Sequence, residues 1–319
     1  MCSFVFRIHI AVSMTGTFSY EKLVLKEGYG KYKPNEFSEC HILLHLLEPE
    51  QHASLNIGYQ LDKEIKIVVG HSLTHVACTV DLCLLTMFEG EKCTLQCTAA
   101  ASDAAAGDEY LMLELTLVSF LAANELYSTS YQDKLMRAVT LKELGTSAFV
   151  AGNVSTAFHK FSRSLKYLAC SAVDKDSFVS DSILSNGTCA SDSCHPMLNA
   201  NGDVSDLNMC HLTCDDIARL TCHCWLNLAA CQLRYQNFKM AAVNCSKALD
   251  KDPNNVKGLF RRAQCNMKIG NEHAAVVDLE QALALEPGNR EITRLLSTAR
   301  QLIRKSDDKL AAAMSKMFR

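Results

Sequence analysis

The sequence lacks the features that define several protein classes. Its 319 residues contain no run of about eighteen apolar residues, so no segment is predicted to cross a membrane. The apolar start, residues 1–13, is interrupted by Arg7 and His9, so we expect no secretory signal. The formal net charge is only −3, which argues against a nucleic-acid-binding protein. What remains is a soluble, globular chain long enough for two domains.

Disulfide and zinc signatures are also lacking, although the chain has 16 cysteines. No CxxC pair with partners at metal-ligand spacing occurs. The sequences Cys222-His223-Cys224 and Cys210-His211 are the zinc alternative, but residues two apart on a helix point in different directions. Because most of the cysteines lie in helical patterns, we expect reduced thiols in the cytosol or nucleus, and neither metal nor cofactor.

A period of 34 residues is the strongest positive signal in the chain. Four residue pairs share this spacing: Trp225 and Leu259, Ala241 and Ala275, Ala248 and Ala282, and Pro253 and Pro287. A large residue early in a first helix, small residues where two helices touch and a proline after the second helix are typical of the tetratricopeptide (TPR) repeat. The pattern predicts pairs of antiparallel helices.

A third copy lies upstream, where Gly145 marks a close approach of two helices and Ala157 and Phe161 fit the second helix. The predicted repeats therefore span residues 137–172, 218–255 and 256–289. Between the first two lies an excess of about 50 residues, and the Ser-, Asp- and Asn-rich stretch 173–213 is predicted to be a flexible insertion.

Residues 290–319 form an apolar pattern with three- and four-residue steps, which predicts a C-terminal capping helix. Residues 256–319 contain 12 Lys and Arg against 7 Asp and Glu, so this end of the chain is basic. The basic residues Arg294, Arg300, Arg304 and Lys305 also fit a calmodulin-target helix. A solvated cap is the favoured interpretation.

Polar side chains on the first helices of the repeats predict a binding groove. Lys257 and Arg261 are four residues apart and share a helix face, and the repeat register places Lys142 and Asn227 on the corresponding helices. Together these groups are suited to bind a terminal carboxylate and a neighbouring acidic side chain. The pattern resembles the two-carboxylate clamp of TPR co-chaperones, with Thr146 at the fifth position where those proteins usually have Asn.

The resemblance extends beyond the clamp. Lys257-Gly258-Leu259-Phe260-Arg261-Arg262 and the closing Met314-Ser315-Lys316-Met317-Phe318 resemble the TPR region of large FKBP-type immunophilins. Upstream, the alternation around Leu113, Leu115 and Leu117 predicts a half-buried strand. Residues 15–122 resemble an FKBP domain, with one short helix over about 76–87 and residues 1–14 as an N-terminal extension.

In that family the isomerase acts within a pocket of aromatic side chains, and here those residues are scarce. Val80 replaces the tryptophan of the pocket floor, and between residues 38 and 109 the only aromatic residues are Tyr59 and Phe88. We therefore expect an FKBP-like domain without isomerase chemistry. A metal site among His41, His45, His71 and His75 is a minor alternative.

The expected fold class is α+β multidomain: a degenerate FKBP-like antiparallel β domain, followed over residues 130–319 by an all-α TPR superhelix with a capping helix. We expect a non-catalytic co-chaperone whose clamp, formed by Lys142, Thr146, Asn227, Lys257 and Arg261, binds the acidic tail of heat-shock protein 90 or 70 family chaperones. A client would bind the N-terminal domain. The alternatives are an active peptidyl-prolyl isomerase and a scaffold for another acidic peptide. The expected location is the cytoplasm, with the nucleus as a second location.

Overall fold

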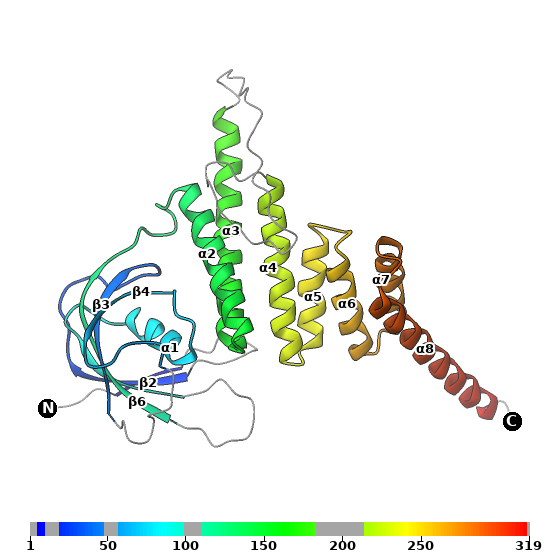
Figure 1. Ribbon diagram of the computed structural model, residues 1–319, viewed down its shortest axis with the longest axis horizontal. Coiled ribbons are helices and arrows are strands. Elements are labelled where there is room, and N and C mark those ends of the chain that lie inside the picture. Colours follow the sequence, from blue (N-terminus) through cyan, green and yellow to red (C-terminus); the bar gives the residue numbers. More distant parts are fainter. Residues whose placement is uncertain (1–4, 10–18, 48–56, 99–109, 183–213, 318–319) are drawn as a thin grey trace. The chain divides into compact units, whose positions relative to one another are not determined.

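The computed structural model describes residues 5–9, 19–47, 57–98, 110–182 and 214–317 (Figure 1). The chain divides into two compact units, Met1–Phe178 and Val179–Arg319. The first unit contains an antiparallel sheet, one short helix and a pair of long helices, and the second contains the remaining helices. The predicted α+β class, with a β domain before a helical region, is confirmed.

The sheet of the first unit is antiparallel throughout, and among the described residues its strand order is β1-β2-β5-β6-β3-β4. Its strands are β1 (Val5–His9), β2 (Ser19–Lys26), β3 (Glu39–Leu46), β4 (Glu64–Val68), β5 (Lys92–Thr98) and β6 (Tyr110–Leu121). The sequence pattern assigned residues 5–9 to an N-terminal extension. They instead form an edge strand, because their backbone pairs with Ser19–Leu23 of β2.

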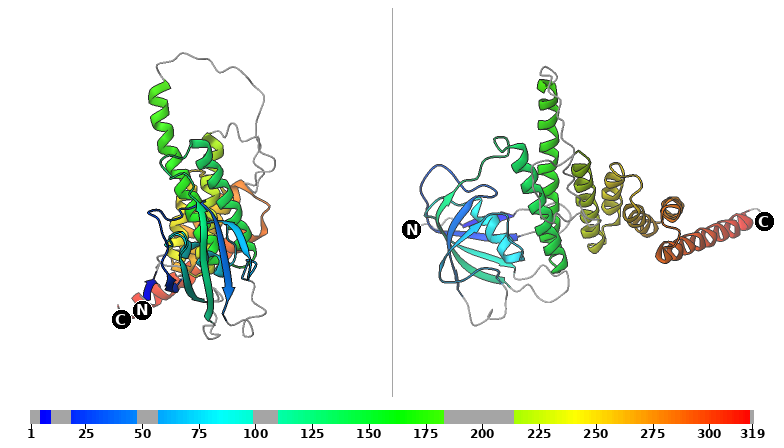
Figure 2. Two further views of the ribbon diagram at one scale, coloured as in Figure 1. Left: turned by 90° about the vertical axis from the view of Figure 1, so that its left-hand side faces the viewer. Right: turned by 45° about the horizontal axis from the view of Figure 1, so that its top comes forward.

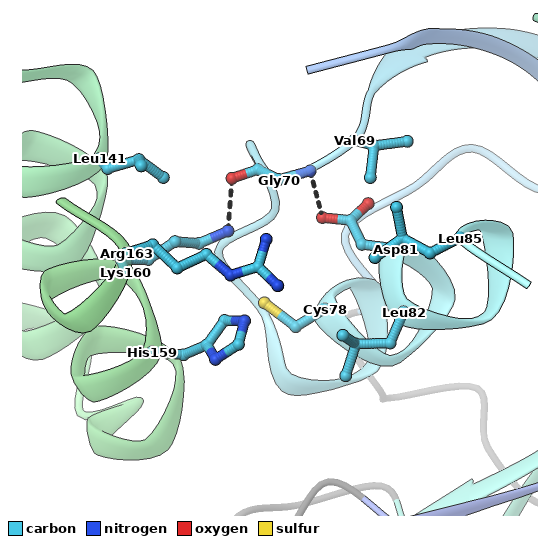
Figure 3. Close-up of a pocket in the computed structure, with 10 residues that line it drawn as sticks. All are labelled: Val69, Gly70, Cys78, Asp81, Leu82, Leu85, Leu141, His159, Lys160 and Arg163. Atoms are coloured by element: carbon cyan, nitrogen blue, oxygen red, sulfur yellow. Dashed lines mark hydrogen bonds between the residues drawn. The ribbon is translucent and has the colours of Figure 1, made fainter. Parts of the chain in front are cut away.

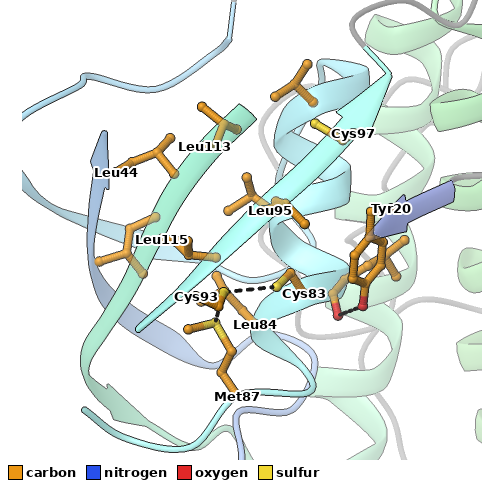
Figure 4. Close-up of a cluster of buried hydrophobic side chains, with 14 of the residues drawn as sticks. Tyr20, Leu44, Cys83, Leu84, Met87, Cys93, Leu95, Cys97, Leu113 and Leu115 are labelled. Atoms are coloured by element: carbon orange, nitrogen blue, oxygen red, sulfur yellow. Dashed lines mark hydrogen bonds between the residues drawn. The ribbon is translucent and has the colours of Figure 1, made fainter. Parts of the chain in front are cut away.

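The core of this sheet follows from the two-residue period of its strands. In β6 every second residue from Leu111 to Leu117 is a buried leucine, and in β3 the buried positions also alternate with partly exposed ones. Apart from Tyr20 and Lys22 of β2, the buried side chains from the strands are aliphatic or thiol-bearing. Figure 4 shows several of them packed together, among them Leu44, Cys93, Leu95, Leu113 and Leu115.

Helix α1 (His75–Leu84) lies against one face of the sheet (Figures 1 and 2). It begins where the hydroxyl of Thr74 accepts a hydrogen bond from the Ala77 backbone N–H (3.2 Å). It ends earlier than the predicted residue 87, because Thr86 and Met87 form tighter turns with backbone hydrogen bonds to the third residue before each. Val80 and Leu84 are fully buried in the core that α1 shares with the sheet.

The first helical pair, α2 (Tyr131–Val150) and α3 (Val154–Ser182), belongs to the first unit. The predicted close approach at Gly145 is present, since a β-carbon there would lie 2.7 Å from Cε1 of Phe161. Helix α3 continues to Ser182, so residues 173–182 of the predicted insertion are helical. The rest of that insertion lies outside the described residues.

The compact units divide after Phe178, whereas the predicted domain boundary lies between residues 122 and 130 and stays a prediction. The sequence pattern placed the first repeat with the other repeats, because all of them share helical periodicity. In the structure the pair α2–α3 packs with the β domain, through contacts that periodicity does not encode.

The second unit contains α4 (Cys214–Arg234), α5 (Phe238–Leu249), α6 (Val256–Ile269), α7 (Glu272–Leu285) and α8 (Arg290–Met317). Successive helices contact one another, and their contacts are lined by small residues such as Ala241, Ala248, Ala275 and Ala282, all fully buried. These are the alanines that recur with the 34-residue period, so the period arises from the residues at which helices pack. Among the described residues, no helix is both long and apolar enough to cross a membrane.

Helix α8 covers α7 with its first half and extends beyond it. Ile292, Leu296 and Ala299 are buried in the core shared with α6 and α7. Towards the C-terminus, Leu310 and Met314 are exposed. The first half thus closes the core of the last repeat, as a capping helix should.

Candidate functional site

The five residues predicted to form the carboxylate clamp lie in both units. Lys142 and Thr146 are on α2 of the first unit. Asn227 on α4, and Lys257 and Arg261 on α6, are in the second unit.

Helix α6 is held in place by its capping residues and by one close contact. The side chain of Asn255 accepts a hydrogen bond from the Gly258 N–H (2.9 Å), which caps the N-terminus. A β-carbon at Gly258 would lie 3.1 Å from Cδ2 of Leu249, so this glycine lets α6 approach α5 closely. The helix ends at Gly270, whose left-handed backbone (φ 86°) favours glycine. One face of α6, with Leu259 and Ala263, is therefore buried.

Lys257 and Arg261 lie together on α6, one exposed and the other half-buried. Burial lowers the pKa of the Lys257 ammonium below its usual value, and the positive charge of Arg261 lowers it further. Burial also lowers the pKa of Arg261. Neither side chain forms an ion pair with a carboxylate among the described residues, so the two cations repel each other and an anion bound there would be stabilised.

The guanidinium of Arg261 is oriented by the backbone of α4. Its Nη1 donates a hydrogen bond to the carbonyl of Leu226 (2.7 Å), the residue before Asn227. Asn227 is half-buried on the same helix. The structure thus brings Lys257, Arg261 and the Asn227 segment together within the second unit. Sequence reasoning did not identify the Leu226 carbonyl, because a backbone acceptor leaves no signal in the sequence.

In the first unit, Thr146 has a limited capacity to replace the expected asparagine. Its hydroxyl donates to the backbone carbonyl of Lys142 (3.0 Å), one turn earlier on α2. The Lys142 side chain is 2% exposed. Because the Thr146 hydroxyl proton is used within the helix, its oxygen can only accept a further hydrogen bond, whereas an asparagine amide could also donate one.

The interior of the β domain next to α1 is mostly aliphatic, although the buried Tyr20 of β2 donates its hydroxyl to the carbonyl of Leu82 in α1 (3.5 Å). Val80, at the position of the expected tryptophan, is fully buried beside Leu84, Leu95 and Leu115 (Figure 4 shows the last three). Of the two aromatic residues noted between 38 and 109, Tyr59 is bonded to Ser72 and Asp81, and Phe88 lies under the Lys33 ammonium (4.4 Å). Residues 48–56 and 99–109 are not among those described.

Of the histidines considered as metal ligands, three contact other side chains. His41 contacts Glu64 (3.1 Å), His45 contacts Asp62 (2.5 Å), and the His71 ring packs edge-on against Phe37. Cys222 and Cys224 are buried on α4. Over the described residues, no group of three His, Cys, Asp or Glu side chains is positioned to hold a metal ion. Cys210 and His211 lie outside them.

Comparison with known proteins shows sequence similarity to FKBP-type immunophilins. No protein-family model matches the sequence. The bovine peptidyl-prolyl cis-trans isomerase FKBP4 is 26% identical over 307 residues, which cover 91% of this chain and 56% of that protein. The human FK506-binding protein-like is 26% identical over 239 residues, covering 75% of this chain and 54% of that protein. The chain thus spans about half the length of these curated relatives.

Among solved structures, the first TPR of Spaghetti (RPAP3), bound to an HSP90 peptide, matches with a TM-score of 0.36 and 18% identity. This match covers 53% of the present chain and 95% of the solved one. The resemblance to FKBP-type immunophilins, which the sequence motifs indicated, is confirmed by the curated relatives.

Proposed function

We propose that this chain is a co-chaperone adaptor whose helical repeats bind the acidic C-terminal tail of a heat-shock protein 90 family chaperone, or of a heat-shock protein 70 family chaperone. Lys257 and Arg261 bind the carboxylates, and Asn227 donates an amide hydrogen bond. Lys142 and Thr146 occupy the corresponding positions of the first repeat, where the lysine contributes a positive charge and the threonine a hydroxyl oxygen. The similarity to the bovine FKBP4 and the human FK506-binding protein-like supports the relation to FKBP-type immunophilins.

One observation carries this proposal: the two adjacent cations of α6. Lys257 and Arg261 lack carboxylate partners among the described residues, and each has a lowered pKa. By contrast, the neighbouring Arg262 is bound by both oxygens of Asp278 (2.9 and 2.7 Å). A structural arginine is thus paired with a carboxylate, whereas the Lys257–Arg261 pair remains available to an anionic ligand.

Binding of an acidic C-terminal pentapeptide of a chaperone, measured calorimetrically with a free or an amidated terminus, tests the proposal. Lys257→Ala is expected to weaken binding of the free peptide about ten- to hundredfold, because a charge-assisted hydrogen bond is lost. Amidation of the terminus should weaken it similarly, and added salt should weaken binding to the wild type. Lys268→Ala, which removes an exposed lysine from the last turn of the same helix, is the matched control and should bind normally.

Equal binding of the free and amidated peptides, or normal affinity of Lys257→Ala, would contradict the clamp. Preference for an unrelated acidic peptide over both chaperone tails would instead support a scaffold for another partner.

The β domain is proposed to be non-catalytic and to contribute a surface for a client protein. The first part is supported by the valine at position 80, which lies in a mostly aliphatic core. Because the FKBP4 relative is named an isomerase, peptidyl-prolyl isomerase activity is the alternative. An isomerisation assay on a proline peptide distinguishes the two, since a rate above the uncatalysed one that scales with protein concentration would establish an enzyme. We also propose a cytoplasmic location, with the nucleus as the alternative, which fluorescence imaging of the tagged chain would test.

A further inference from the structure

A lysine of the first helical pair is buried against the β domain. Lys160 on α3 is 2% exposed, and its ammonium donates a hydrogen bond to the backbone carbonyl of Gly70 (2.5 Å). Gly70 lies in the loop between β4 and α1. Nearby, the side chain of Asn153 donates to the carbonyl of Leu73 in the same loop (3.1 Å). Burial of a lysine is costly unless the charge is compensated, so this contact requires a partner of opposite charge.

That partner lies on the other side of the same residue, as Figure 3 shows. The backbone N–H of Gly70 donates to Asp81 of α1 (2.9 Å), whose side chain is also buried. The second carboxylate oxygen of Asp81 accepts from Tyr59 (3.2 Å), and Tyr59 is bonded to Ser72 (2.6 Å). The backbone of Gly70 has a φ of 95°, a region that favours glycine. Lys160, Gly70 and Asp81 therefore form a continuous polar chain from α3 to α1, called here the junction relay.

The charges of Lys160 and Asp81 interact across the relay. Burial raises the pKa of the Asp81 carboxyl, and the positive charge of Lys160 opposes this shift. Other groups facing the junction are His159, whose pKa burial and Lys160 lower to about 4, and Arg163, whose pKa burial also lowers. Arg163 is paired with Glu36 of the β domain. The buried Lys160 and the partly buried Arg163 thus each have a carboxylate that compensates the charge.

Contacts around Glu36 extend the same junction. Tyr167 of α3 donates to Glu36 (3.4 Å) and packs edge-on against Phe37 (ring centroids 5.7 Å apart). The guanidinium of Arg137 on α2 lies over the Phe37 ring, 4.8 Å from its centroid. Both helices of the first pair are therefore attached to the β domain.

We propose that the β domain is the N-terminal cap of the helical repeats, held to the first helical pair by the junction relay. A terminal repeat has no preceding neighbour to cover its outer face and needs a cap. Here α1 and the loop before it cover the face of α3 that carries Lys160, which gives the β domain a role that requires no isomerase chemistry. A client would have to bind elsewhere on the domain, since α3 occupies this face. The proposal does not depend on the peptide-binding function.

Hydrogen exchange of the full-length chain, followed by mass spectrometry, tests the cap. Lys160→Met is expected to speed exchange about tenfold or more in α1 of the β domain and in α2 together, because the Asp81 charge loses its compensation. Lys166→Met removes the same charge from an exposed position on α3 and should leave exchange unchanged. These readouts involve no peptide, so they are separate from the test of the clamp.

Asp81→Asn provides a second variant, because the asparagine oxygen still accepts from Gly70. Asp81→Asn alone should speed exchange in both elements. The double variant with Lys160→Met should have a smaller effect than the sum of the effects of the two single variants. Faster exchange confined to α3 and the Gly70 loop, with α1 and α2 unchanged, would overturn the proposal. So would strictly additive effects of the two substitutions.

Discussion

Two neighbouring arginines on α6 have different roles because their side chains meet different partners. Arg262 donates to both carboxylate oxygens of the buried Asp278 and also to Ser246. This pairing raises the pKa of Arg262, whereas burial lowers that of Arg261. Arg261 donates only to a neutral carbonyl among the interactions described, so its charge can still attract an anion. Arg262 therefore serves stability, and Arg261 is suited to recognition.

At the residue scale, His159 predicts a pH dependence of stability. Its pKa is lowered to about 4, first by burial and then by Lys160, so the folded chain keeps it neutral while the unfolded chain protonates it near its usual value of about 6.5. As the pH falls from about 6.5 to about 4, the unfolded state binds more protons and the free energy of unfolding decreases, by at most about 3 kcal/mol from this residue.

His159→Gln should therefore reduce the difference in unfolding free energy of the first unit between pH 7 and pH 5, measured by urea titration. Part of the difference will persist, because burial also lowers the pKa of His71 and His75 in this unit. His273→Gln, which changes an exposed residue of the second unit, is the control. An unchanged pH profile in His159→Gln would refute the assignment.

At the element scale, the contact of α2 with α3 depends on the absence of a side chain at Gly145. An added β-carbon would lie 2.7 to 3.1 Å from three atoms of the Phe161 ring, which is itself buried. Gly145→Ala is therefore expected to destabilise the first unit by about 1–3 kcal/mol, despite the higher helix propensity of alanine. Thermal unfolding followed by circular dichroism measures the loss.

Two further variants test whether the crowding is local. Phe161→Leu in the Gly145→Ala background should recover part of the lost stability, because the ring atoms nearest to the new methyl group are removed. Gly288→Ala, at a position with nothing within 4 Å of an added β-carbon, should be close to neutral. A Gly145→Ala variant as stable as wild type would show that the helices can separate without cost.

At the scale of the whole molecule, the chain should unfold in two steps, because it consists of two compact units. Lys160→Met is expected to lower the midpoint of one calorimetric transition, that of the first unit. Arg262→Ala leaves the buried Asp278 without its cation and should lower the other midpoint by several degrees. A single transition that both substitutions shift equally would contradict two separate units.

Most of the helical elements could be predicted from the sequence, because their signals are local. The 34-residue period identified the alanines at the helix contacts, and Gly145 marked the approach to Phe161. The β1 strand was missed because five residues carry too little pattern, and only pairing with β2 identifies it. Helix propensity likewise did not indicate that α3 continues to Ser182.

The candidate site was predictable only in part. The spacing of Lys257 and Arg261 placed both on one face of α6, because four residues make about one helical turn. The sequence contained a further signal that was not used: Lys160 interrupts an otherwise buried helix face with Thr156, Ala157, Phe161 and Ser164. A lysine at such a position indicates a buried polar partner, although the sequence does not identify it.

The sequence by itself determined the order of most elements, the repeat period and the position of Lys257 and Arg261 on one face of α6. These features depend on backbone periodicity within short segments. Only the tertiary structure decided which elements share a unit and which charges are paired. The first helical pair joins the β domain because Lys160 and Asp81 meet at Gly70. Arg262 is structural because Asp278 lies opposite it. Such contacts depend on distances between residues far apart in the chain, which local patterns do not contain.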